Sequence, residues 1–179
     1  MAVSAVFLDR DGVINRKAPD GDYIKSWEEF AFLPGAVEAI KILNESGWKV
    51  IVVTNQRGIA LGLMTEADVE EIHKKLSLEI QKHGAHIDRI YYCPHEKGSC
   101  SCRKPDIGMF LKAKEDFPEL SFSSSFVVGD SSSDMEAGKS LACKLILITE
   151  NSSTIDQKAG YHQAISLYTA VQKYIVTGK

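Results

Sequence analysis

The stretch AVFLDRDGVIN, residues 5–15, sets a short apolar run directly before two acidic residues. Residues 5–8 have only apolar side chains, which is typical of a strand that is buried on both faces. Asp9 and Asp11 follow at positions i and i+2, so an extended backbone would point both carboxylates to the same side. Such a pair resists joint ionisation unless a cation lies between the two groups or one of them stays protonated. The alternative is a pair of loop acids that cap a turn.

Similar apolar runs recur along the chain and alternate with helical patterns. The predicted strands are Ala5–Leu8, Val50–Val53, Ile87–Tyr92, Phe126–Val128 and Leu145–Ile148. The predicted helices are Ala36–Ser46, Glu66–His83, Met109–Phe117, Asp134–Leu141 and Ser166–Val176. This alternation predicts an α/β fold with a doubly wound, mostly parallel sheet, in a single domain of residues 1–179. Ligands of such folds bind beyond the carboxyl ends of the strands.

Polar residues follow two more of the predicted strands. Thr54 ends the second strand, where its hydroxyl and the backbone N–H groups of the next turn could hold phosphoryl oxygens. Asp130 follows the fourth strand and, with the first-strand acids, supplies the hard oxygen ligands that Mg²⁺ prefers. Asp134 is either one more ligand or an acid in the first turn of a helix. A carboxylate bound to Mg²⁺ can attack phosphorus while a neighbouring acid with a raised pKa protonates the leaving oxygen.

Two cations stand together in the segment CRKP. Lys104 offers a compact positive charge for a phosphoryl group, and the planar fork of Arg103 suits a second phosphate or a polar group of the substrate. Solvated surface charge is the alternative for both. Pro105, which restricts the turn, and Cys102 next to the pair favour a defined position instead.

Three cysteines and one histidine cluster within ten residues. Cys93, His95, Cys100 and Cys102 match a structural Cys₃His zinc site in ligand number and type, inside a loop that leads straight to the two cations. A Cys100–Cys102 disulfide is the alternative. Cys143 lies in an apolar segment and is predicted to be a buried small hydrophobe.

The bulk composition limits the partners. The chain has 179 residues and a net charge of −3, with no basic block that would indicate binding to nucleic acid or to a membrane. The N-terminus shows no targeting pattern, so we expect a cytoplasmic monomer with reduced cysteines. His73, His83 and His86 have no metal partner at a useful spacing, and we expect them in solvated or helix-terminal positions.

Four motifs in order, FLDRDGV, VVTN, Lys104 and VGDSSSD, resemble those of the haloacid dehalogenase superfamily of phosphotransferases. The resemblance implies that Asp9 is the nucleophile and forms an aspartyl-phosphate, and that Asp11 is a general acid and then a base. It implies that Thr54 and Lys104 stabilise the transferred phosphoryl group. It also implies Mg²⁺ bound by Asp9, by Asp130 and by the backbone carbonyl of Asp11.

The segments DRDGVIN, VVTNQRGIALG, IYYCPH and CRKP are similar to the branch of that superfamily that holds histidinol-phosphate and heptose-bisphosphate phosphatases. This resemblance implies hydrolysis of the C7 phosphate of D-glycero-D-manno-heptose 1,7-bisphosphate, a step toward nucleotide-activated heptose for lipopolysaccharide and related surface polysaccharides. It implies structural zinc, a small flap after the first strand and no large cap domain. The residues implied in binding the phosphorylated sugar are Thr54, Asn55, Gln56, Arg57, Arg103 and Lys104.

Two other functions remain open. Histidinol-phosphate phosphatase is favoured by Leu61, where the heptose enzymes usually have arginine, and by the short spacing from His95 to Cys100. A non-catalytic module that binds metal or phosphate is the alternative outside enzymes, and the presence of both Asp9 and Lys104 argues against it. A nucleic-acid 3′-phosphatase fits the mildly acidic charge less well.

Overall fold

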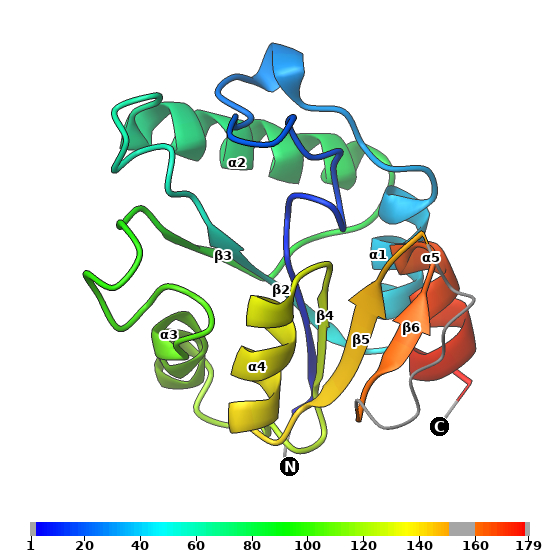
Figure 1. Cartoon of the computed structure of the whole chain (residues 1–179). Coiled ribbons are helices and arrows are strands. Elements are labelled where there is room, and N and C mark those ends of the chain that lie inside the picture. The colour runs from blue at the N-terminus through cyan, green and yellow to red at the C-terminus, as the bar shows by residue number, and fades with distance from the viewer. Residues whose placement is uncertain (1–2, 151–159, 178–179) are drawn as a thin grey trace.

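The computed structural model describes residues 3–150 and 160–177, which form a parallel sheet with helices on both faces (Figure 1). The strand order is β3-β2-β1-β4-β5-β6. The strands are β1 Ala5–Leu8, β2 Lys49–Asn55, β3 Arg89–Cys93, β4 Phe126–Gly129, β5 Lys144–Ile148 and β6 His162–Ala164. The helices are α1 Ala36–Glu45, α2 Glu66–Lys82, α3 Gly108–Asp116, α4 Ser132–Ser140 and α5 Leu167–Ala170, with a 3₁₀ turn η1 Trp27–Glu29 and a π-helical turn η2 Val171–Ile175. The predicted doubly wound fold is confirmed.

The alternation of side chains along β1 shows how the sheet is covered on both faces. Val6 and Leu8 pack in one core with α1, α2 and α5, whereas Ala5 and Phe7 pack in the other core with α3 and α4. All four side chains are fully buried. A strand with one apolar face would leave one helical layer without a partner, so the continuous apolar run explains the three-layer architecture.

The strand register brings the carboxyl ends of the central strands to one edge. Leu8, the last residue of β1, is level with Val52 in β2 and with Val128 in β4. The chain leaves β1 toward β2 on one side but later returns from β3 to β4 on the other side. The crevice between the ends of β1 and β4 is therefore the topological switch point, where ligands of open α/β sheets bind.

The segment from residue 12 to residue 35 forms a short flap after β1. It contains η1 and an aromatic group in which Trp27 stacks on Phe30 at 4.8 Å between ring centroids. Phe32 meets Phe30 edge-on at 5.2 Å. The flap crosses above the sheet toward α2 (Figure 1).

Helix α2 begins at a local capping motif, whereas the C-terminal segment differs from the predicted single helix. Thr65 and Asp68 form a capping box at the start of α2. Residues 166–176 are not one α-helix, because α5 passes into the π-helical turn η2 after four residues. The short edge strand β6 has no apolar run and was not predicted. In the described ranges no helix is long and apolar enough to span a bilayer.

Candidate active site and metal-ligand clusters

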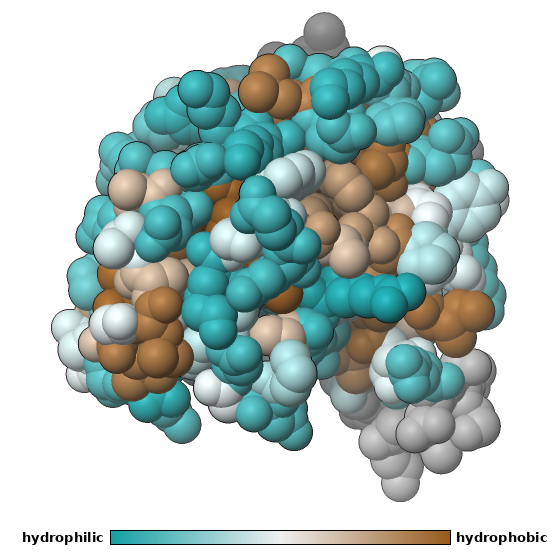
Figure 2. Space-filling view, turned by 90° about the horizontal axis from the view of Figure 1, so that it is seen from above, coloured by the Kyte–Doolittle hydropathy of each residue, from teal (hydrophilic) through white to brown (hydrophobic). Residues whose placement is uncertain are grey.

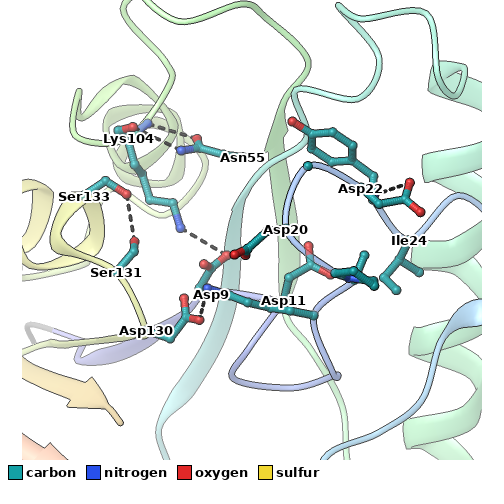
Figure 3. Close-up of a pocket in the computed structure, with 15 residues that line it drawn as sticks. Asp9, Asp11, Asp20, Asp22, Ile24, Asn55, Lys104, Asp130, Ser131 and Ser133 are labelled. Atoms are coloured by element: carbon teal, nitrogen blue, oxygen red, sulfur yellow. Dashed lines mark hydrogen bonds and ion pairs between the residues drawn. The ribbon is translucent and has the colours of Figure 1, made fainter.

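A polar cavity opens at the switch point above β1 and β4 (Figure 3). Seen from the side to which the strands point, the surface of the molecule is mostly hydrophilic (Figure 2). The cavity is lined by the two acids after β1, by Asn55 at the end of β2, by Lys104, by residues 130, 131 and 133, and by residues 17–24 of the flap. Three strand ends, one loop and the flap thus bring charged groups together that are far apart in the sequence.

Lys104 is a buried cation held between two acids. Its Nζ atom lies 3.2 Å from Oδ1 of Asp9 and 2.6 Å from Oδ1 of Asp134, and it donates to the carbonyl oxygen of Val53 at 2.7 Å. The side chain of Asn55 holds the Lys104 backbone on both sides, because it accepts from the N–H at 3.0 Å and donates to the carbonyl at 3.1 Å. Burial alone would lower the pKa of Lys104, but the two acids outweigh it and raise that pKa.

The sequence left open whether Asp134 is a metal ligand or an acid in the first turn of a helix, and the structure shows two contacts of its side chain. Its carboxylate closes a capping box with Ser131 at the start of α4, and its other oxygen binds Lys104. The side chain is 1% exposed. Asp134 therefore connects the position of α4 to the position of the buried ammonium group.

Carboxylate oxygens of Asp9, Asp130 and Asp134 lie within 4.8 Å of one another. Oδ1 of Asp130 is buried and has no hydrogen-bond partner, and burial raises the pKa of this group although the ammonium of Lys17 pairs with it. Both oxygens of Asp134 are already engaged, which leaves Asp9 and Asp130 as the available donors. Hard oxygen donors with an unpaired buried atom fit Mg²⁺.

Asp11 is held differently from Asp9. Arg10 donates to both Asp11 oxygens, at 3.1 and 3.0 Å, and Asn15 and Gln56 donate to one oxygen each, at 2.8 and 2.9 Å. Burial would raise the pKa of Asp11, but the Arg10 charge and these hydrogen bonds hold it below its usual range. The Asp11 carboxylate is not part of the metal-ligand cluster.

The acid with the raised pKa is Asp9, whereas the sequence predicted a raised pKa for its neighbour Asp11. Desolvation by burial is the largest effect and raises the pKa, while the charge of Lys104 opposes the shift. The acids at 134, 11 and 130 also raise it, and together these effects bring the pKa to about 7. The prediction that Asp11 has a raised pKa is wrong for this state of the site, because four donor contacts stabilise its ionised form.

The remaining predicted substrate-binding residues lie in different places, and only some of them line a cavity. Thr54 is 1% exposed, and its hydroxyl accepts from Gln56 at 2.9 Å. Arg57 lies outside the cavity wall and pairs with Glu96 of the cysteine loop at 2.6 Å. Arg103 lines an adjoining cavity together with Asn55, Lys104 and Ser132, among others.

The four predicted zinc ligands form a second cluster. The Sγ atom of Cys102 lies 3.0 Å from that of Cys93 and 3.3 Å from that of Cys100, and Nδ1 of His95 is 3.2 Å from the Cys102 sulfur. All three cysteines are free thiols, so the alternative of a Cys100–Cys102 disulfide is wrong. Three sulfur donors and one imidazole at these separations fit a closed tetrahedral zinc site.

The cysteine loop is attached to the active site at both ends. At its start, the carbonyl oxygen of Cys93 accepts from the backbone N–H of Gln56 at 2.8 Å. At its end stands Lys104, two residues after Cys102. Metal binding to the cluster would therefore restrain the segment that contains Lys104, whose ammonium group is buried.

Sequence reasoning missed two members of the site. Arg10 is fully buried and binds Asp11, although the sequence analysis gave it no role. His73 is 7% exposed and lies 3.1 Å from Arg10, so the expectation of a solvated or helix-terminal position is wrong. The signal was present in α2, where His73 lies at helical spacing among the buried residues Val69, Ile72, Leu76 and Ile80.

Such a fold and site, with acids at the switch point and a buried lysine beside them, define a phosphatase of the haloacid dehalogenase superfamily. The sequence profile described as polynucleotide kinase 3 phosphatase matches residues 5–173, and the chain belongs to this family.

Curated relatives and a solved structure narrow the similarity. The chain is 44% identical over 138 residues to D-glycero-alpha-D-manno-heptose-1,7-bisphosphate 7-phosphatase of Mycobacterium bovis. The matched residues cover 76% of this chain and 72% of the relative. It is 40% identical over 149 residues to the D-glycero-beta-D-manno-heptose-1,7-bisphosphate 7-phosphatase of Pseudomonas aeruginosa, covering 83% and 82%. The crystal structure of the D,D-heptose 1,7-bisphosphate phosphatase of B. bronchiseptica, complexed with magnesium and phosphate, has a TM-score of 0.87 at 30% identity and covers 98% and 99% of the two chains.

Proposed function

We propose that this chain is a Mg²⁺-dependent phosphatase that hydrolyses the C7 phosphate of D-glycero-D-manno-heptose 1,7-bisphosphate. The observation that supports it most is the placement of Asp9 in the cavity between Lys104 and the partner-free oxygen of Asp130. This is the arrangement that phosphoryl transfer to a carboxylate requires. The relatives that match most of the chain act on the same phosphorylated sugar.

In the first half of the reaction, an oxygen of Asp9 attacks phosphorus and the bond from phosphorus to the C7 oxygen breaks. The negative charge of the bound substrate phosphates raises the pKa of Asp11. Its protonated form gives its proton to that oxygen, so the sugar leaves as an alcohol and Asp9 becomes an aspartyl-phosphate. Lys104 stabilises the charge on the phosphoryl group in the transition state, and Thr54 adds a hydroxyl once the contact of Gln56 is released. Mg²⁺ held by Asp9, Asp130 and the Asp11 carbonyl would neutralise negative charge where phosphate meets carboxylate.

In the second half, water attacks the phosphorus of the aspartyl-phosphate. Asp11, now ionised, takes a proton from this water, and the bond between phosphorus and the Asp9 oxygen breaks. Inorganic phosphate leaves and both carboxyl groups return to their starting state. The hydrogen bonds that Asp11 accepts in the structure suit this base form, because they stabilise the carboxylate.

Recognition of the second phosphate is assigned to the cavity beside Lys104. Arg103 lines that cavity, and its Nη1 atom is buried without a hydrogen-bond partner. A buried guanidinium group with a free donor suits a phosphate oxygen. We place the enzyme in the cytoplasm, where a cluster of free thiols persists and binds zinc.

Substitution Asp9→Asn tests the nucleophile. We expect it to lower phosphate release from heptose 1,7-bisphosphate by at least about 10³-fold, because the amide cannot form the covalent intermediate. Zinc content and the circular dichroism spectrum should stay those of the wild type. Asp20→Asn, in the flap on the same cavity wall, is the matched control and should keep most of the rate. Turnover by Asp9→Asn near the wild-type rate would contradict the assignment.

A substrate panel tests the specificity. It contains both anomers of heptose 1,7-bisphosphate, histidinol phosphate and a 3′-phosphorylated oligonucleotide, each measured as kcat/KM with Mg²⁺. We expect one heptose anomer to be preferred over both histidinol phosphate and the oligonucleotide by at least about tenfold in kcat/KM. That ratio corresponds to the contribution of one well-placed charged contact. Preference for histidinol phosphate or for the oligonucleotide would overturn the proposed substrate while leaving the phosphatase assignment intact.

A further inference from the structure

Arg10 is a buried cation with an unusual set of partners. It separates the two acids after β1, is 0% exposed, and is the largest fully buried side chain among the described residues. Its Nη2 atom donates to both Asp11 oxygens and lies 3.3 Å from Oε1 of Gln56. Its Nη1 atom lies 3.1 Å from Nε2 of His73 on α2. A buried guanidinium group without such partners would cost several kcal/mol, roughly the penalty of an unpaired buried charge.

The contact with His73 determines the state of the imidazole. A guanidinium group only donates hydrogen bonds, so Nε2 of His73 must accept, and the ring is neutral with its proton on Nδ1. Burial, together with the Arg10 charge, lowers the pKa of His73 to about 3. His73 is therefore a neutral hydrogen-bond acceptor at neutral pH.

The position of Asp11 depends on this pair. The Asp11 side chain is 25% exposed and lines the cavity, while Arg10 lies behind it on the protein side. Without an acceptor on α2 the guanidinium group would keep only its contacts to Asp11 and Gln56, and Nη1 would be an unpaired buried donor. A shift of Arg10 to find another acceptor would turn the Asp11 carboxylate with it.

We propose that His73 is a positioning residue for the reaction: it anchors Arg10, and Arg10 holds the Asp11 carboxylate in the orientation for proton transfer to the leaving oxygen. The proposal rests on the proposed phosphatase function and adds to it a residue of α2 that touches neither substrate nor metal ligands. Its contribution belongs to the step in which the leaving group is protonated.

This assignment has a kinetic signature that a purely structural role lacks. A sugar alkoxide is a poor leaving group and needs a proton from Asp11, whereas the nitrophenolate of p-nitrophenyl phosphate leaves without one. The ratio kcat/KM covers the steps up to release of the leaving group, so hydrolysis of the aspartyl-phosphate does not contribute. A misplaced Asp11 therefore lowers kcat/KM for heptose bisphosphate and spares that for p-nitrophenyl phosphate.

The test compares His73→Leu with His73→Gln, which keeps an acceptor that Arg10 can reach. We expect His73→Leu to lower kcat/KM for heptose 1,7-bisphosphate by about tenfold or more, a part of the 10²- to 10⁴-fold that general acid catalysis supplies. The value for p-nitrophenyl phosphate should stay within about twofold, on the same reasoning. His73→Gln should recover most of the loss. His83→Leu, on the exposed end of the same helical segment, is the control and should change neither value.

The outcomes separate the two proposals. If the wild type hydrolyses both substrates and His73→Leu lowers both values equally, or neither, the positioning role is overturned and the phosphatase function stands. If the wild type releases phosphate from neither substrate, the proposed function itself fails. Should His73→Leu not fold, Arg10→Lys provides the same comparison, because a lysine cannot reach His73, Asp11 and Gln56 together.

Discussion

The pKa values of Asp9 and Asp11, which are two positions apart, are shifted in opposite directions because their surroundings differ. Asp9 is desolvated near other acids, and its pKa rises to about 7. Asp11 accepts from Arg10, Asn15 and Gln56, and its pKa falls. The spacing in the sequence predicts a pair of acids, but it does not show which of the two accepts hydrogen bonds from the Arg10 side chain. The side chain of Arg10 determines this, and its direction is a property of the folded chain.

The buried His73 predicts a pH dependence of stability. Its folded pKa of about 3 lies below the unfolded value of about 6.5, so its contribution to stability is intact above pH 6.5 and is lost as the pH falls toward 3. Asp9 acts in the opposite sense, because its raised pKa makes the folded state less stable as the pH rises from about 4 to about 7.

Comparison of the wild type with His73→Gln isolates the histidine. We expect the difference in free energy of unfolding between the two proteins to move by about 2 kcal/mol in favour of the variant between pH 7 and pH 5. Urea denaturation at several pH values measures it. Arg10, Asp11 and the Tyr92 ring are the groups near the imidazole, and they are the same in both proteins. A difference that does not change with pH would contradict a buried neutral imidazole.

At the scale of elements, the loop between β3 and α3 connects the proposed zinc cluster to Lys104. Cys93 ends β3, Cys102 follows in the loop, and Lys104 comes two residues later. The loop has little regular structure of its own, so the four ligands and the Asn55 hydrogen bonds supply its rigidity. Loss of one ligand should therefore displace Lys104 in the active site.

Substitution Cys102→Ala tests this connection. We expect loss of bound zinc, measured by atomic emission, and a fall in kcat of about 10- to 100-fold, because a small displacement of a catalytic group has a cost of that order. Cys143→Ala removes a buried thiol that is outside the cluster and should retain both zinc and activity. Full activity of a zinc-free Cys102→Ala protein would separate the cluster from catalysis.

At the scale of the whole molecule, the carboxylates of the proposed magnesium site come together only in the folded chain. Asp9 and Asp130 belong to strand ends that are more than one hundred residues apart in the sequence. A ligand that binds only the folded state raises its stability by mass action. Added Mg²⁺ should therefore stabilise the protein against heat.

Thermal denaturation with increasing Mg²⁺ measures this effect. We expect Tm to rise by several degrees when Mg²⁺ exceeds its Kd by about 100-fold, since that ratio corresponds to about 2.7 kcal/mol. Asp130→Asn should remove most of the rise, and Asp88→Asn, which changes an acid at the opposite end of β2, should retain it. An equal rise in all three proteins would assign the stabilisation to another site.

The sequence by itself determined the type of sheet, the elements with strong apolar patterns, and the polar side chains that meet in the cavity and in the cysteine cluster. It could do so because continuous apolar runs, helix caps and clustered ligands are local signals, as in β1, α2 and the cysteine loop. The tertiary structure alone decided the short edge strand β6, the π-helical end, and the partners of Arg10, His73 and Asp134. Those features depend on contacts between residues far apart in the chain, where burial and a neighbouring charge set the state of each group.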